Sequence, residues 1–398
     1  MKSLPFSTNP ADPMGVLTTE ALRSRKAAFA LEKEYIELFE SLPGPNVFFS
    51  PEWVYSWLLS LGRKYEVCFI VCRDGGKLVG VWPFFEHRIP VIGKSLLPVG
   101  AQAADLFDPV AHDAAMRPMV EALCGLCGEY AFAWLPLLSL NFAEAVLQPA
   151  SESGMAQHFL RKRTERFLIE LDHFKSFEDF MQMVFGPKTR QSLRRKARRL
   201  SEKGEVRFQS LESPEEITPW ITKAMELEKQ SWKGKEGVGA FKRATHRAFY
   251  HLLMESLAGR RRLRLSILTL DGQLAAYEIG ILGTDHYCMH GTAYDPSLGS
   301  FSPGRLLMLH VLEKCLGEKR KIYDFLQNEQ EFKRQMSTHE SSFWDWIVLP
   351  RTLRGGILLA LIRGLHQWSE WKRKRRKKAK ESDGKTADNI HTEPGDAD

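Results

Sequence analysis

The chain of 398 residues carries a formal net charge of +7, and 43% of its residues are apolar. Such a chain can bury sizeable hydrophobic cores, and its length predicts about two domains. Eight of the nine residues from Lys372 to Lys380 are basic, so this run accounts for the whole formal excess and leaves the body near neutral. A near-neutral body argues against a nucleic-acid groove along the whole chain.

No apolar run is long enough to span a membrane. The longest candidate, Gly355 to Leu365, is interrupted by Arg363 and is far shorter than the roughly 20 apolar residues of a spanning helix. The segment Met1 to Gly15 carries prolines and polar groups where a secretory signal needs an apolar core. The sequence therefore predicts a cytoplasmic protein.

The first half of the chain has the pattern of a mixed α/β unit. A short helix is expected to begin at Ser50-Pro51-Glu52, and Asp74-Gly75-Gly76 is typical of the turn of a β-hairpin. The elements expected around and after this turn are strands over 66–72 and 77–86, a helix over 113–127, a strand over 132–138, a helical connection near 141–154 and a strand over 166–171.

The second half repeats this order. We expect helices within 177–203, 214–233 and 241–259, followed by strands over 262–270 and 273–282. The turn Asp271-Gly272 between these strands corresponds to Asp74-Gly75 in the first half. This correspondence predicts two degenerate lobes of one kind, although no tandem identity is visible in the sequence.

A basic helix is expected between the lobes, over residues 188–203. Its two faces are formed by Leu193, Ala197 and Leu200 on one side and by Arg190, Arg194 and Arg198 on the other. Guanidinium groups offer planar sets of donors that bind phosphates, so Arg190 and Arg194 are candidates for substrate binding. An exposed basic helix without a special role is the alternative.

The segment from Leu274 to Trp346 has the architecture of a site. We expect a strand over 286–291, a helix over 303–317, a strand over 321–326, a short helix over 329–336 and a strand over 343–349. Ser302 suits the N-cap of the first helix, Pro303 suits its first position, and Gly304 lets a ligand approach the backbone. The start of such a helix binds anions through its free amides and its dipole.

Three side chains of the strand over 286–291 fall on one face, because strand side chains alternate. They are His286, Cys288 and His290. We interpret them as a partly buried polar face beside the site, and we predict no metal, since a metal would need a further ligand.

Several motifs are shared with a known family. They are Ala275-Ala276-Tyr277-Glu278, Gly291-Thr292-Ala293-Tyr294-Asp295-Pro296, Ser302-Pro303-Gly304-Arg305-Leu306-Leu307, Tyr323-Asp324-Phe325-Leu326 and Phe332-Lys333-Arg334, with Phe49-Ser50-Pro51-Glu52-Trp53 and Arg190-Gln191-Ser192-Leu193-Arg194-Arg195 upstream. In this order they resemble a GNAT acyltransferase core, and more narrowly the CelD-like (cellulose biosynthesis) acetyltransferase branch, related to the FemAB aminoacyltransferases. The resemblance covers roughly residues 40–350. It implies a transferase that uses an acyl thioester, usually acetyl-CoA.

The resemblance also implies a fold class. We expect an α/β fold, an α+β arrangement with a mixed sheet, in two GNAT-like lobes of which the second is better formed. The expected parts are an N-terminal extension (1–35), an N-terminal lobe (36–175), a C-terminal acyltransferase lobe (176–350), and an amphipathic and basic helix followed by a disordered acidic tail (351–398).

Direct acyl transfer needs a bound donor, a route for the acceptor proton and donors for the oxyanion, but no covalent nucleophile. Asp324 and Glu278 are the candidate bases, because apolar neighbours disfavour their charged forms; either is alternatively an arginine's structural partner. Tyr294 is a candidate for protonating the leaving thiolate, or else caps the sheet. Lys333 and Arg334 are candidates for neutralising a phosphate or an acidic acceptor, or else surface charges.

The donor is expected at the helix start, where Ser302, Gly304 and Arg305 are the candidate contacts for its phosphates. GNAT enzymes usually bind the CoA pyrophosphate with a Gln/Arg-x-x-Gly-x-Gly/Ala loop. The corresponding residues 296–305 keep Gly299 and Gly304 but not that pattern. Acetyl-CoA or another acyl-CoA is therefore the expected co-substrate, and an aminoacyl-tRNA donor stays open.

The function predicted from the sequence is an acyltransferase, by resemblance an N-acetyltransferase acting on a small-molecule or glycan acceptor of polysaccharide or cell-envelope metabolism. The alternatives are an aminoacyl-tRNA-dependent transferase and a non-catalytic accessory protein. Apolar residues from Ile357 to Trp371 and the basic run from Lys372 to Lys380 form one amphipathic unit that suits an anionic membrane surface, which would place the protein at the inner face of the membrane. The acidic end, residues 381–398, is expected to be disordered.

Overall fold

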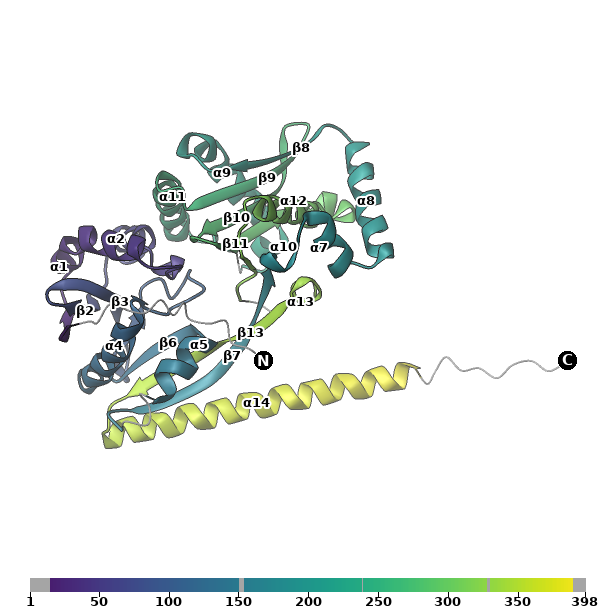
Figure 1. The fold of residues 1–398 in the computed structure, drawn as a ribbon. Helices are drawn as coiled ribbons and strands as arrows, with labels where there is room; N and C mark the ends of the chain where they lie inside the picture. Colours follow the sequence, from purple (N-terminus) through teal and green to yellow (C-terminus); the bar gives the residue numbers. More distant parts are fainter. Residues whose placement is uncertain (1–14, 150–153, 238, 328–329, 389–398) are drawn as a thin grey trace.

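One continuous mixed sheet forms the centre of the molecule. The computed structural model describes residues 15–149, 154–237, 239–327 and 330–388 (Figure 1). Hydrogen bonds join the strands in the order β1-β2-β3-β4-β6-β13-β7-β12-β11-β10-β9-β8, and β5 pairs with β3 beside this path. The strands are β1 (Leu17–Leu22), β2 (Val67–Asp74), β3 (Lys77–Ile89), β4 (Gly93–Pro98), β5 (Val110–Ala111), β6 (Phe132–Ser139), β7 (Gln157–Glu170), β8 (Val206–Leu211), β9 (Leu263–Leu270), β10 (Gln273–Leu282), β11 (His286–Tyr294), β12 (Ile322–Asp324) and β13 (His339–Leu349).

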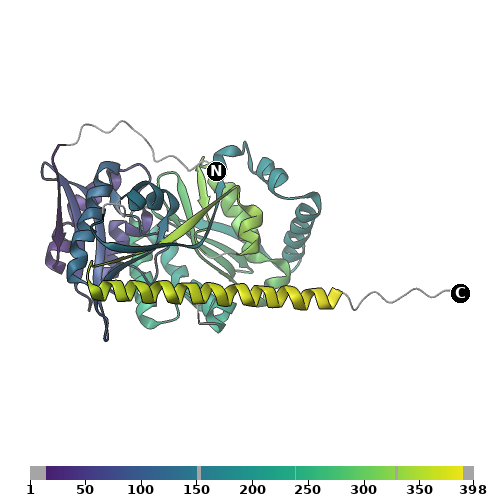
Figure 2. The ribbon, with the colours of Figure 1, turned by 90° about the horizontal axis from the view of Figure 1, so that it is seen from below.

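Helices flank this sheet along its length (Figures 1 and 2). They are α1 (Arg25–Ala30), α2 (Glu32–Ser41), α3 (Pro51–Leu59), α4 (Asp113–Leu126), α5 (Leu140–Phe142), α7 (Phe177–Val184), α8 (Pro187–Ser201), α9 (Pro214–Gln230), α10 (Trp232–Lys235), α11 (Ala244–Gly259), α12 (Pro303–Gly317), α13 (Glu331–Met336) and α14 (Leu353–Asp388). The helix predicted at Ser50-Pro51-Glu52 is α3, which has Ser50 as its N-cap, and the helix predicted over 303–317 has the predicted bounds.

The two halves of the chain build the sheet in the same way. In the first half β1 to β4 are antiparallel neighbours and β4 runs parallel to β6. In the second half β8 to β11 are antiparallel neighbours and β11 runs parallel to β12. The turns Asp74-Gly75 and Asp271-Gly272 therefore occupy equivalent hairpins. This topology confirms the mixed α/β fold with two lobes of one kind.

Each lobe is completed by a strand from the other half. Strand β13, which ends the second half, pairs with β6 of the first, and β7, which ends the first half, pairs with β12 of the second. Strands β7 and β13 also pair with each other at the centre of the sheet. This exchange explains why β7 starts at Gln157, well before the strand predicted over 166–171.

At the edge of the sheet in the first half, β1 pairs with β2, so the first lobe begins before residue 36.

The C-terminal segment differs from its prediction. A single helix, α14, runs from Leu353 to Asp388, so the disorder expected from residue 381 is wrong for residues 381–388. The strong helix formers lie just before, in residues 372–381, which are lysine, arginine, alanine and glutamate. Extending an existing helix is easier than starting one, so α14 continues through the following residues to Asp388. Residues 389–398 of the predicted tail lie outside the described residues.

Candidate active site

The parallel strands β11 and β12 separate soon after they meet. They pair only from His286 to Cys288 on β11 and from Ile322 to Asp324 on β12. From Met289 to Tyr294, β11 pairs with β10 on one side, while its other edge lines a cavity of about 1090 Å³. Backbone amides and carbonyls along such an edge can pair with an extended ligand. The separation therefore creates a binding slot in the middle of the sheet.

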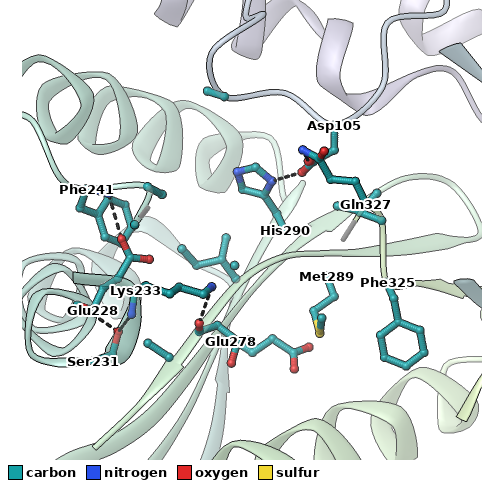
Figure 3. Close-up of a pocket in the computed structure, with 18 of the residues that line it drawn as sticks. Asp105, Glu228, Ser231, Lys233, Phe241, Glu278, Met289, His290, Phe325 and Gln327 are labelled. Carbon is teal, nitrogen blue, oxygen red and sulfur yellow. Dashed lines mark hydrogen bonds and ion pairs between the residues drawn. The ribbon is translucent and has the colours of Figure 1, made fainter. Parts of the chain in front are cut away.

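Both lobes line this cavity. The first lobe contributes the loop Ala101–Asp105 together with Trp134 and Arg163. The second lobe contributes the open edge of β11, the start of α12 and the segment after β12. Figure 3 shows Asp105 of the first lobe close to His290 and Gln327 of the second. A pocket shared in this way can bring two substrates together.

His290 reaches into this space because the strand bulges there. The pairing passes from Ile279 opposite Gly291 to Gly280 opposite Met289, so His290 is the extra residue of a β-bulge. Bulges often redirect a side chain beside an active site.

Cys288 belongs to the same hydrophobic cluster as Phe48, Trp53 and Tyr250, the ring neighbours of His290, whereas Tyr287 and Met289 belong to another cluster. Cys288 and His290 therefore share a face of β11, as the alternation predicted.

The His290 ring is hydrogen-bonded on both sides. Its Nδ1 lies 2.9 Å from Asp105 Oδ2 in the first lobe, and its Nε2 lies 3.0 Å from the Tyr250 hydroxyl on α11. Gln327 Nε2 donates to the other oxygen of Asp105 at 2.6 Å (Figure 3). An Nδ1–H donated to Asp105 leaves Nε2 as the acceptor for Tyr250. This is the tautomer of a general base oriented by a carboxylate.

The sequence analysis missed this arrangement. Asp105 and His290 are 185 positions apart and belong to different lobes, so no local pattern connects them. The one available signal is Gly291, because a glycine inside a strand pattern often marks a bulge. Tyr250 lies on α11, within the helix predicted over 241–259, and no site residue was predicted on that helix.

Glu278 lies in the cavity wall and is 1% exposed. The hydroxyls of Tyr287 and Tyr323 each donate a hydrogen bond of 2.8 Å to its Oε1. Burial raises the pKa of Glu278 to about 7, although both tyrosines and Arg264 act in the opposite direction. The carboxyl group is therefore poised to titrate near neutral pH, as the sequence predicted for a carboxylate on an apolar strand.

This raised pKa predicts a pH dependence of stability. Because the folded protein holds the proton where the unfolded chain has lost it, the contribution is complete below the ordinary glutamate pKa of 4.5 and is lost as pH rises through about 7. The loss corresponds to about 3 kcal/mol of unfolding free energy. We expect Glu278→Gln to remove it. Urea unfolding of both proteins across this pH range tests the expectation, and parallel profiles would contradict it.

Asp324 lies outside the cavity. It is fully buried and pairs with Arg166 of β7, whose Nη2 lies 2.5 Å from Oδ2. Its Oδ1 accepts a hydrogen bond from the backbone N–H of Leu326. The alternative considered in the sequence analysis, a structural partner of an arginine, describes this carboxylate better than a base does. Its pairing fixes β12 against β7 at the point where β11 and β12 separate.

The start of α12 forms one end of the cavity. Ser302 holds the N-cap position but makes no capping hydrogen bond, because its φ of 54° places it in the left-handed region; the expected capping role is therefore wrong. Its hydroxyl instead accepts a hydrogen bond from Lys196 of α8. Its carbonyl accepts from the N–H groups of Arg305 and Leu306, so fewer amides are free for an anion than the sequence suggested.

Arg305 supplies the cation at this end. Its guanidinium lies over the Phe185 ring, and burial lowers its pKa. Within the described residues nothing accepts a hydrogen bond from its Nε, which is buried. Gly304 and Tyr294 pack closely, since a Cβ on Gly304 would lie 3.3 Å from the Tyr294 ring, and Gly299 lies beside them. An anionic group bound here would supply the missing acceptor.

The other predicted binding residues divide into two groups. Lys333 lines the cavity, is buried and donates hydrogen bonds of 2.8 Å to the carbonyls of Phe325 and Gln327. Burial lowers its pKa to about 8, so the surface-charge alternative is wrong for this residue. Arg334 lies outside the cavity, with its guanidinium over the Phe167 ring.

The arginines of the basic helix are also outside the cavity. Arg190 donates to the carbonyl of Phe185 at the end of α7, and Arg194 is exposed opposite Glu178. The residue of α8 that reaches the site is instead Lys196, through Ser302. A second buried group, Glu228, accepts hydrogen bonds from Tyr277 and from the N–H of Phe241 in the cavity wall.

Comparison with known proteins agrees with this geometry. Residues 187–334 match the acetyltransferase (GNAT) domain. The matched GNAT domain runs from α8 to α13 and contains His290, Glu278 and the start of α12. It indicates an acyltransferase fold in the second lobe. No curated protein matches the chain in sequence.

Solved structures share the whole two-lobed fold, not only the GNAT domain. FemX matches with 11% identity and a TM-score of 0.59, covering 86% of this chain and 99% of its own. The C-terminal domain of a putative lysylphosphatidylglycerol synthetase from Agrobacterium fabrum matches with 12% identity and a TM-score of 0.53, covering 83% and 95%. A conserved protein of unknown function from Bacteroides thetaiotaomicron matches with 13% identity and a TM-score of 0.51, covering 80% and 97%. At these identities the likeness shows the fold alone.

Among residues 15–149, 154–237, 239–327 and 330–388, no helix is both long and apolar enough to cross a membrane. In the same ranges, no group of three or more His, Cys, Asp or Glu side chains is arranged to hold a metal ion.

Proposed function

We propose that the protein transfers an acyl group directly from an acyl-CoA to an amine or hydroxyl acceptor bound between its two lobes. The observation that carries this proposal is the placement of His290. This histidine, bulged from β11 and held between Asp105 and Tyr250, lies beside the open strand edge of a domain matched to GNAT acetyltransferases. Acyl-CoA is the co-substrate, with acetyl-CoA as the first candidate.

The donor fits along the open edge of β11. Its phosphates would lie at the start of α12, against Arg305 and Gly304, where a cation and a helix dipole coincide. Tyr294 lies at that same end, four residues from His290. At about 3.3 Å per residue, the strand edge between them is roughly 13 Å long. An extended pantetheine arm spans such a length, and its amides can pair with the strand edge. The thioester would then reach His290.

This geometry changes the roles assigned from the sequence. Tyr294 lies at the phosphate end, so it suits packing against the donor better than protonating the thiolate. Tyr250 is hydrogen-bonded to His290, but burial raises its pKa well above the usual range, so the protonated His290 is the better proton donor for the thioester end. Glu278 is a buried carboxyl group in the cavity wall. Asp324 is the ion-pair partner of Arg166 and takes no part in the proposed reaction.

The proposed reaction moves one proton and one acyl group. The acceptor displaces the Tyr250 hydroxyl from His290 Nε2 and transfers its proton there as its nitrogen or oxygen attacks the thioester carbon. The carbon–sulfur bond then breaks, and the leaving thiolate takes the proton from the His290 imidazolium, which Asp105 stabilises until then. No covalent enzyme intermediate is needed, which agrees with six buried cysteines, none of which lines the cavity.

The acceptor is proposed from the sequence resemblance alone. The CelD-like motifs favour an acceptor linked to polysaccharide or cell-envelope metabolism, and N-acetylation of an amino group is the first reaction to examine. The two-lobed cavity supports an acceptor of more than a few atoms, since the first lobe supplies Asp105, Trp134 and Arg163 to its wall.

A second candidate is transfer from aminoacyl-tRNA. It is supported by the exposed arginines of α8, of which Arg194 and Arg198 each have 75% of their side-chain surface exposed, and by the whole-chain fold likeness to FemX. Binding of tRNA to this helix would weaken steeply with salt, because each phosphate contact releases counterions. Salt-dependent tRNA binding without any response to acyl-CoA would favour this candidate over the first.

The acyl-CoA proposal predicts a saturable thermal shift. A ligand at about 100 times its dissociation constant stabilises the folded protein by roughly 2.7 kcal/mol. We expect this shift with acetyl-CoA, longer acyl-CoAs or free CoA, and we expect Gly304→Glu to abolish it by placing a carboxylate beside the phosphate site. Arg305→Ala should weaken it by removing the cation.

The matched control is Gly317→Glu, at the other end of the same helix. A Cβ at Gly317 meets nothing within 4 Å, so the same carboxylate is tolerated there away from the cavity. This variant should keep the ligand shift. A wild-type protein that shows no shift with any CoA species would contradict the donor assignment.

A further inference from the structure

Helix α14 is fixed to the body along one face. Leu359 and Gly355 are buried there against the central strands β7 and β13. His366 Nδ1 lies 3.2 Å from Arg161 of β7, and Arg354 donates to the carbonyls of Val91 and Ile92. These contacts hold the first turns of α14 against the sheet, so its orientation relative to the body is defined.

The opposite face of α14 is apolar and exposed. It carries six large side chains, each between 51% and 85% exposed: Leu353, Ile357, Leu361, Leu365, Trp368 and Trp371. Successive members are three or four positions apart, so they form one stripe along the helix. Soluble surfaces seldom carry an apolar row of this length unless it binds something. We call these six residues the outer stripe.

Basic side chains lie beside the two tryptophans at the C-terminal end of the outer stripe. Lys372 Nζ lies 3.5 Å from the ring centre of Trp368, and the Arg375 guanidinium lies 4.6 Å from that of Trp371. The sequence adds further basic residues up to Lys380. Tryptophan favours the boundary between lipid headgroups and acyl chains, and basic residues beside it attract anionic headgroups. The helix therefore offers apolar, interfacial and cationic groups in one row.

We propose that the outer stripe lies on an anionic membrane surface, with α14 parallel to the bilayer plane. The apolar side chains enter the headgroup boundary, and the basic run contacts acidic lipid headgroups. Figures 1 and 2 show α14 running along the molecule and extending past the second lobe. The six side chains of the outer stripe are exposed along it. The inference does not depend on the acyl-transfer proposal.

Charge argues against a second copy of the chain as the occupant. A parallel pairing of two outer stripes would bring two basic runs together. An antiparallel pairing would set each basic run near Arg351 and Arg354 of the other copy. Repulsion between like charges disfavours either dimer, whereas an anionic membrane surface attracts the basic residues.

Vesicle flotation of the full-length protein tests the proposal. We expect binding to vesicles of phosphatidylcholine mixed with phosphatidylglycerol and little binding to phosphatidylcholine alone. Trp368→Ser combined with Trp371→Ser should lower the partition coefficient on the order of tenfold or more, since half-exposed indole rings lose their buried area in the bilayer. Lys372→Gln combined with Arg375→Gln should lower it roughly 20- to 30-fold.

The control removes two equally exposed apolar side chains elsewhere. Leu59→Ser combined with Met183→Ser changes residues of α3 and α7 that are 52% and 68% exposed, and it should leave vesicle binding unchanged. The proposal is overturned if the wild type ignores both vesicle types, if it binds both equally, or if the tryptophan variant binds as the wild type does. A dimer in sedimentation experiments that the tryptophan variant converts to monomer would assign the outer stripe to a second copy instead.

Discussion

Replacing His290 with glutamine lowers the turnover number for acyl transfer by about 10²- to 10⁴-fold, the usual contribution of a general base. Glutamine keeps a polar atom near the position of Nε2 but cannot accept a proton from the acceptor. Donor affinity should stay near the wild-type value, because the proposed phosphate contacts lie at Arg305 and Gly304. Release of free CoA thiol from acetyl-CoA in the presence of an amino-sugar acceptor measures the turnover, and the acyl-CoA thermal shift measures the affinity.

His286→Gln is the matched control for this prediction. His286 lies on the same strand and also has a carboxylate neighbour, with its Nδ1 2.7 Å from Asp285, but it does not line the cavity. Its replacement should leave turnover unchanged. Asp105→Asn should reduce turnover less than His290→Gln does and alter the pH profile, since it removes the charge that stabilises the imidazolium. Full turnover in a folded His290→Gln protein would remove histidine from the mechanism.

Replacing Asp324 with asparagine destabilises the protein by about 3–5 kcal/mol, the usual result of leaving a buried charge unpaired. Asp324 has no exposed surface, and 16% of the Arg166 side chain is exposed, so solvent does little to compensate for the lost carboxylate. The double variant Arg166→Leu with Asp324→Leu should recover much of the loss, because it removes both charges. Urea unfolding at neutral pH measures these differences.

An exposed ion pair provides the comparison for Asp324. Glu121 pairs with Arg117 on the surface of α4, and Glu121→Gln should change stability by less than about 1 kcal/mol. Measuring the stability and the turnover of the Asp324→Asn protein distinguishes a structural role of this carboxylate from a catalytic one. A variant Asp324→Asn with near-normal stability but greatly reduced turnover would contradict the structural role and return this carboxylate to the active site.

Local sequence determined the elements of this fold because their signals act over a few residues. Pro303 after Ser302, and an apolar run ending near Gly317, fixed the bounds of α12. Two-residue turns formed the two equivalent hairpins, Gly75-Gly76 in the first half and Asp271-Gly272 in the second, since all four residues adopt positive φ. The order of these elements was sufficient to predict a mixed sheet in two related lobes.

The same local signals were misleading where backbone or long-range contacts dominated. Ser302 has the residue type of an N-cap, but its left-handed backbone turns the side chain toward Lys196. Lys333 has the residue type of a surface charge, but two backbone carbonyls hold it inside the cavity. Asp324 and Glu278 are both carboxylates on apolar strands, and only the position of Arg166 distinguishes them.

The sequence by itself determined the elements, their order, the basic run near the C-terminus and the segment that forms the second half of the cavity. Tertiary structure alone decided which side chains meet there. The strand exchange between lobes, the bulge at His290 and its contact with Asp105 join residues that are far apart along the chain. Periodicity reports only neighbours within a helix turn or a strand, so it contains no information about such pairs. The outer stripe of α14 follows the same rule, because burial of the opposite face against β7 and β13 decided which apolar residues stay exposed.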